Sequence, residues 1–173
     1  MYETWCRWVP NEALHAGRSF YPDQTSLIHM MPGVRIREFT FDGDYVKVLS
    51  LWQGIETGMQ VGRSDAPEEI KRKLERDPDL FLVSESDREI IATIIGGYDG
   101  RRGMIYHLAV RKDFRRLGVG AALLAKVEER LHAKGCVKIY LLVLDDNVSA
   151  IRFYEECGWK HSQHDLIFSK ELP

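Results

Sequence analysis

The chain has 173 residues, of which 45% are hydrophobic and 29% charged, and its formal net charge at pH 7 is −2. This length suits one globular domain. No stretch approaches the roughly 18 uninterrupted apolar residues of a membrane helix, and the net charge creates no basic field for nucleic acid. The three cysteines, Cys6, Cys136 and Cys157, are odd in number and lack metal-ligand spacing. We therefore expect reduced thiols, no metal and a cytoplasmic protein without a nucleic-acid or membrane partner.

Residues 1–33 differ from the rest of the chain. They contain Pro10 and Pro22, several aromatic residues and no sustained periodicity, and Pro32-Gly33 precedes a clean strand pattern. We expect an N-terminal extension outside the core, or an artefact of a cloning junction or start site, before a single domain over residues 34–173. The alternative, in which the aromatic residues of the extension cover a substrate cleft, stays open.

From residue 34 onward, short apolar runs alternate with segments of helical periodicity. The predicted strands are residues 34–40, 80–84, 90–96, 104–110, 137–144, 159–163 and 166–169. The predicted helices are residues 43–54, 66–77, 119–134 and 149–157. The resulting order, β-α-α-β-β-β-α-β-α-β-β, predicts an α/β fold (α+β in some schemes) in which helices flank a sheet.

The most specific signal lies between the strand at 104–110 and the helix that follows it. Its sequence is Arg115-Arg116-Leu117-Gly118-Val119-Gly120. The first N–H groups of a helix lack intrahelical acceptors and lie at the positive end of its dipole, and glycine lets an anion approach closely. Four cations surround the turn: Arg111, Lys112, Arg115 and Arg116. The segment predicts a polyanion site, although an ordinary strand–helix turn is an alternative.

Two separated elements connect this turn to a known family. Arg115, Gly118 and Gly120 fit the pattern Q/R-x-x-G-x-G/A. Further along, Asn147-Val148-Ser149-Ala150-Ile151-Arg152-Phe153-Tyr154 is followed by Gly158-Trp159. With both elements in this order, the chain resembles the GNAT family of N-acetyltransferases over about residues 34–170. Residues 96–103 are similar to a small bacterial subgroup whose acceptor is unassigned, although a tight hairpin explains them equally.

The resemblance implies a mixed, mostly antiparallel sheet that splays between its fourth and fifth strands. It implies acetyl-coenzyme A as co-substrate, with the pyrophosphate at the turn and the pantetheine arm along the fourth strand. The implied cofactor-binding residues are Leu108, Ala109, Val110, Arg115, Arg116, Leu117, Gly118, Val119, Gly120 and Asn147. Asn147 is equally well explained as a helix N-cap, and the two roles are compatible.

The implied reaction is direct transfer of the acetyl group to a primary amine of a small molecule or a peptide. The resemblance implies that Tyr154 is the general acid. A phenol with a pKa of about 10 stays protonated at neutral pH and can hydrogen-bond the leaving sulfur; a packed aromatic residue is the alternative. Strict alternation along residues 104–110 predicts that Tyr106, a tentative base or water relay, faces one side of the sheet. His107 is expected to face the other side and to pack beneath the sheet.

The acceptor itself is not implied, because Met104 and Leu142 stand where better-known relatives carry acidic or basic groups. The tentative substrate cleft, on the first two helices, consists of Trp52, Gln53, Glu56 and Thr57. Two other functions stay open: a non-catalytic module that binds and senses acyl-coenzyme A, and an ordinary nucleotide-binding α/β protein. We expect a monomer or a homodimer.

Overall fold

A computed structural model describes residues 33–162 and 165–172. The strands are β1 (Val34–Glu38), β2 (Phe81–Ser86), β3 (Glu89–Tyr98), β4 (Gly103–Val110) and β5 (Ile139–Leu141). The helices are α2 (Phe41–Gln53), α3 (Pro67–Arg76), α4 (Val119–Ala133) and α5 (Val148–Glu156), with 3-10 turns η1 (Arg63–Asp65) and η2 (Lys112–Phe114). None of the helices in these ranges is long and apolar enough to cross a membrane.

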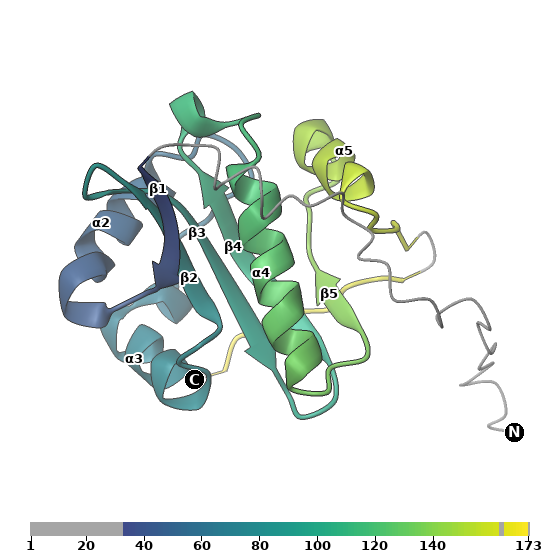
Figure 1. The fold of residues 1–173 in the computed structure, drawn as a ribbon. Helices are drawn as coiled ribbons and strands as arrows, with labels where there is room; N and C mark the ends of the chain where they lie inside the picture. Colours follow the sequence, from purple (N-terminus) through teal and green to yellow (C-terminus); the bar gives the residue numbers. More distant parts are fainter. Residues whose placement is uncertain (1–32, 163–164, 173) are drawn as a thin grey trace, which may run out of the picture.

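The strands form one sheet in the order β1-β2-β3-β4-β5. Strands β1 to β4 are antiparallel to their neighbours, whereas β4 and β5 are parallel and pair only from Gly103↔Ile139 to Ile105↔Leu141. Strand β4 continues to Val110, so its second half has no partner on the β5 side within the described residues. Figure 1 shows the two strands separating toward η2 and α5. The predicted fold class, including the splay, is confirmed.

Two hydrophobic cores fill the two faces of the sheet. Helix α4 covers one face with Leu123, Leu124 and Val127, all fully buried. Helices α2 and α3 cover the other face (Figure 1). In α2, Val48 and Trp52 are buried four residues apart, as expected for a helix that presents one apolar stripe to a sheet. The sheet is therefore the middle of three layers.

An ionic cluster joins β1, α2 and β2. The Arg37 guanidinium contacts both carboxylate oxygens of Asp44, at 2.6 and 2.8 Å, and also Glu85 Oε2 at 2.6 Å. Asp44 is 3% exposed and also accepts the Thr40 backbone N–H at 2.8 Å. This cluster fixes the start of α2 against β1 and β2.

The last part of the chain differs from the sequence prediction. The strand predicted at 137–144 is reduced to Ile139–Leu141, and the described residues of 159–163 and 166–169 form no strand. A strand requires a paired neighbour, and β5 has one over only three residues. Residues 165–172 instead cross behind the sheet in Figure 1 and end near η1, where Arg63 donates to the Leu172 carbonyl at 3.2 Å. Apart from Gly33, the predicted extension lies outside the described residues.

Candidate active site

The turn before α4 presents a run of free backbone donors. Arg116 has a φ of +59° and Gly118, the N-cap of α4, a φ of +84°. The first backbone bond of the helix is from the Ala122 N–H to the Gly118 carbonyl, at 3.0 Å. The N–H groups of residues 116–121 donate to no other described residue. They lie at the positive end of a helix of 15 residues, an arrangement that suits a polyanion.

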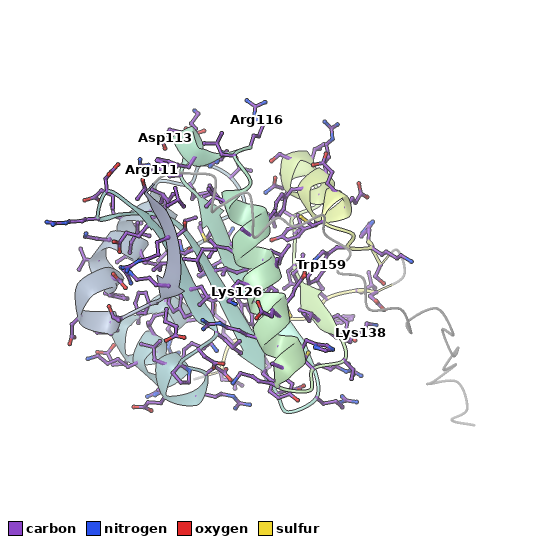
Figure 2. The ribbon with its side chains drawn as sticks, in the orientation of Figure 1. Arg111, Asp113, Arg116, Lys126, Lys138 and Trp159 are labelled. Carbon is purple, nitrogen blue, oxygen red and sulfur yellow. The ribbon has the colours of Figure 1, made fainter. Side chains whose placement is uncertain are left out.

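The four cations predicted around this turn differ in their protein partners. Three of the cations already have protein partners: Arg111 pairs with Asp113 at 2.8 Å, Lys112 lies 3.7 Å from Glu56, and Arg115 Nε donates to the Val110 carbonyl at 3.0 Å. Arg116 is exposed, makes no hydrogen bond or ion pair with another described residue, and points away from the ribbon in Figure 2. Arg116 is thus the cation best placed to meet a phosphate.

Strand β4, the turn and α5 meet at Gly120. A Cβ atom at this position would lie 3.3 Å from Val110 Cγ2 and 3.6 Å from Phe153 Cζ. A side chain here would press against the Val110 methyl by a few tenths of an ångström, so glycine favours the close approach of the three segments. This contact brings the turn beside the helix that carries Tyr154.

The phenol of Tyr154 lies between two aromatic neighbours on the α4 side of the sheet. Its ring centroid is 5.1 Å from that of Phe153 and 5.9 Å from that of Trp159, both in edge contacts. Desolvation raises the pKa of Tyr154 to about 12, with a smaller contribution from Cys157. The hydroxyl is therefore protonated at neutral pH, and it donates to no other described residue.

Asn147 begins α5 as an N-cap, as the second interpretation of this residue predicted. Its Oδ1 accepts the Ala150 backbone N–H and the Ser149 hydroxyl, both at 3.1 Å. Gly58, in the loop between α2 and α3, comes so close that a Cβ there would lie 2.3 Å from Asn147 Nδ2. The start of α5 and this loop therefore border the same region.

A bulge in β4 changes which side chains face the two cores. Thr93 pairs with Ala109 and Ile95 with Tyr106, so two residues of β4 oppose one residue of β3. The bulged residue His107 has a φ of +48°. Strict alternation was therefore wrong for this strand: Ile105 lies in the α4 core, whereas Ala109 lies in the α2 core.

As a result, His107 forms a polar cluster on the α2 side, which sequence reasoning missed. Its Nε2 lies 2.7 Å from Asp65 Oδ1, and its ring makes an edge contact with Trp52 at 4.5 Å between centroids. Asp65 Oδ2 also accepts the Gly62 backbone N–H at 2.8 Å. The expectation that His107 simply packs beneath the sheet is thus wrong. No signal in the sequence joins His107 to Asp65, because 42 positions separate them.

The side chains predicted to line the substrate cleft have different environments. Trp52 is 1% exposed and its indole N–H donates to the Thr93 hydroxyl at 2.8 Å, so it is a core residue that supports His107. Gln53, Glu56 and Thr57 are exposed at the end of α2 and in the loop after it. Tyr106 is 48% exposed, and desolvation raises its pKa, so its phenol is protonated at neutral pH.

Comparison with known proteins identifies the family of the chain. The family model of the acetyltransferase (GNAT) family matches residues 47–159. An acetyltransferase of Photorhabdus laumondii is 43% identical over 140 residues, which cover 80% of this chain and 96% of that protein. An acetyltransferase of Pectobacterium atrosepticum is 43% identical over 127 residues, covering 73% and 88%. The chain belongs to the GNAT acetyltransferase family.

Solved structures share the fold. Ard1 from Thermoplasma volcanium superposes with a TM-score of 0.63 at 28% identity, covering 73% of this chain and 82% of that one. The PaiA N-acetyltransferase of Thermoplasma acidophilum, solved in complex with coenzyme A, gives a TM-score of 0.67 at 19% identity, covering 76% and 92%. In the described ranges, no group of three or more His, Cys, Asp and Glu residues is arranged to hold a metal ion.

Proposed function

We propose that this protein is an N-acetyltransferase that moves the acetyl group of acetyl-coenzyme A directly to a primary amine of a small molecule or a peptide. The observation that carries the proposal is the run of free N–H groups at residues 116–121, which lies beside the opening between β4 and β5. A ligand whose phosphates bind at the turn could extend an arm into that opening.

The donor would be held mainly by backbone groups. The amides of residues 116–120 and the Arg116 guanidinium would bind the pyrophosphate. The pantetheine arm would pair with the main chain of Leu108, Ala109 and Val110, as a peptide pairs with a free sheet edge, because β5 leaves that edge open. Asn147 would contact the arm from the start of α5 while its Oδ1 caps the helix.

Acetyl transfer needs a stabilised oxyanion and a proton for the departing thiolate. Backbone N–H groups near Leu108 and Val110 would stabilise the thioester oxygen as it becomes negative. Tyr154, which its raised pKa of about 12 keeps protonated at neutral pH, would offer its phenol O–H to the departing sulfur as the proton donor. Gln53, Glu56 and Thr57, exposed on the other side of the sheet, would contact the acceptor.

Two measurements on the full chain test this function. Calorimetric titration with coenzyme A, ADP and NAD should give the tightest binding for coenzyme A; preference for ADP or NAD would instead identify a nucleotide-binding protein. Thiol release from acetyl-coenzyme A should then be followed with amino acids, peptides, polyamines and aminoglycosides. Turnover that depends on an amine supports the enzyme, and binding of coenzyme A without turnover with any amine would identify a sensing module.

A further inference from the structure

We propose that His107, oriented by Asp65, receives the proton of the acceptor amine. This inference rests on the N-acetyltransferase function proposed above and assigns to His107 the role of base, for which the sequence offered only Tyr106. Asp65 Oδ1 and His107 Nε2 are 2.7 Å apart. Asp65 is 5% exposed, whereas the His107 side chain is 21% exposed, so the imidazole lies between a buried carboxylate and solvent.

The hydrogen bond to Asp65 fixes which nitrogen of the imidazole carries the proton. A carboxylate only accepts hydrogen bonds, so the neutral ring donates its Nε2–H to Asp65 and leaves a lone pair on Nδ1. Nδ1 makes no hydrogen bond to another described residue. The pair therefore presents one unprotonated nitrogen, which is what a general base requires.

Neighbouring groups hold the two side chains in place. Two hydrogen bonds hold Asp65 in place. Its Oδ2 accepts the Gly62 N–H at 2.8 Å, and its backbone carbonyl accepts the Tyr45 hydroxyl at 3.0 Å. Trp52 packs its ring against the imidazole. A chain of donors, from the Trp52 indole to the Thr93 hydroxyl and from there to the His107 carbonyl at 3.2 Å, fixes the bulge. Such fixed positioning is characteristic of groups that transfer protons.

The position of His107 relative to Tyr154 suits acetyl transfer. His107 directly precedes the three residues expected to hold the pantetheine arm, in the half of β4 beyond its last pair with β5. Its side chain contacts Trp52 on the α2 side, whereas Tyr154 packs against the core on the α4 side. A base and an acid thus approach the thioester from opposite faces of the sheet.

His107 and Tyr154 together account for both protons that move in the acetyl transfer. The amine nitrogen attacks the thioester carbonyl carbon, an N–C bond forms and the C–S bond breaks. The proton lost by the amine moves to His107 Nδ1, and the departing sulfur takes the phenol proton of Tyr154. Return of the proton from the His107 imidazolium to the Tyr154 phenolate through solvent restores both groups, so the net products are an amide and coenzyme A.

The first test compares His107→Gln with His132→Gln in the full chain. His132 is exposed near the end of α4, so its replacement is a matched control. The probe is acetyl-coenzyme A with the best amine found in the panel described above. We expect kcat of His107→Gln to fall by at least about 10²-fold, the usual contribution of a general base, with the Kd of acetyl-coenzyme A within about twofold of the unmodified protein. His132→Gln should change neither value.

The second test separates positioning by Asp65 from a purely structural role. In Asp65→Asn, the Gly62 N–H requires an acceptor, so the amide oxygen faces Gly62 and the amide NH₂ faces His107 Nε2. The ring proton must then move to Nδ1, which removes the free lone pair. Nitrogen-15 NMR of the imidazole, assigned with His107→Gln, should show Nε2–H in the unmodified protein and Nδ1–H in Asp65→Asn. The kcat of Asp65→Asn should fall by at least about tenfold.

Each outcome decides a separate question. Turnover by His107→Gln equal to that of the unmodified protein overturns the inference and leaves the N-acetyltransferase function intact. An unmodified protein that carries the ring proton on Nδ1 also overturns it. Binding of acetyl-coenzyme A with no turnover for any amine contradicts the proposed function itself, and the inference then falls with it. Loss of kcat in both variants with unchanged acetyl-coenzyme A binding supports it.

Discussion

The two sides of β4 are built in different ways. On the α4 side, the proposed donor site consists mainly of backbone groups of one continuous segment, residues 108–120, to which α5 adds Asn147 and Tyr154. On the α2 side, the cluster around His107 uses side chains from α2, η1 and β3, and its contacts join residues 41 and 42 positions apart. A backbone site needs only glycine and a helix start, whereas a side-chain cluster depends on the whole fold. Mutations in the proposed donor site should therefore change the binding of coenzyme A without disturbing the cluster around His107, and mutations in that cluster should leave the binding of coenzyme A unchanged.

The largest effect is expected from removing the proposed proton donor of the departing thiolate. Tyr154→Phe should lower kcat by about 10²-fold because the thiolate then leaves without a proton donor, and the Kd of coenzyme A should stay unchanged. Steady-state kinetics and calorimetry measure the two values. Tyr98→Phe, at the far end of β3, is the control. An unchanged kcat in Tyr154→Phe would remove the acid role of this residue.

Crowding the turn should weaken donor binding. Gly120→Val places side-chain atoms where a Cβ already lies 3.3 Å from Val110, and overpacking of about 1–3 kcal/mol should raise the Kd of coenzyme A by roughly 10-fold to 100-fold. Gly62→Val is a matched control on the acceptor side, because a Cβ there meets nothing within 4 Å. Equal Kd values for the two variants would contradict a role for the close contact at Gly120.

The ionic cluster around Asp44 should make the free energy of unfolding depend on pH in the acid range. Desolvation acts to raise the pKa of Asp44, but hydrogen bonds from Arg37 and the Thr40 N–H hold it below its usual value. The stabilisation is present above the unfolded pKa of about 3.9 and is lost as the pH falls through the lower folded value. Asp44→Asn should lower the free energy of unfolding by about 2 kcal/mol at neutral pH, less than for a fully buried pair because Arg37 keeps Glu85.

Urea denaturation at several pH values measures this effect. The difference between the unmodified protein and Asp44→Asn should be constant above about pH 5 and shrink below about pH 3.9. A difference that stays constant down to pH 2 would contradict the contribution of the charged Asp44.

A substitution of Trp52 should have a smaller effect, and it should change kcat without changing the binding of coenzyme A. Trp52→Phe keeps an aromatic ring but removes the indole N–H bonded to Thr93 and leaves a small cavity in the core, which together should cost about 1–2 kcal/mol of stability. Because the bulge at His107 is then held less firmly, kcat should fall severalfold while the Kd of coenzyme A stays the same. A change confined to coenzyme A binding would contradict the separation of donor and acceptor sides.

The smallest expected effect concerns surface charge at the turn. Arg116→Ala should raise the Kd of coenzyme A by less than about fivefold, as expected for an exposed ionic contact, and should reduce its dependence on salt. Arg111→Ala is the control, since Arg111 is already paired with Asp113. A larger effect for Arg111 than for Arg116 would contradict the assignment of Arg116 as the available cation.

Most of the fold was predictable from local patterns. Helices α2, α3, α4 and α5 and the first four strands lie within a few residues of their predicted bounds, because apolar periodicity, Pro67 and the glycines mark them directly. The end of the chain was not predictable in this way. Apolar runs such as those near Val137 and Leu166 suggest strands, but both residues are more than 80% exposed here and no neighbour pairs with them among the described residues.

The sequence by itself determined the elements of the proposed donor side: the glycines of the turn and the helix that follows them are consecutive, and Asn147–Tyr154 is a second local segment further along the chain. Only the tertiary structure decided the cluster around His107. One extra residue in β4 reverses the direction of His107, and this bulge exists because β3 and β4 pair as they do. The contact with Asp65 then depends on how α2 and η1 pack on the sheet. Neither the register of two strands nor the packing of distant segments is encoded in a local pattern.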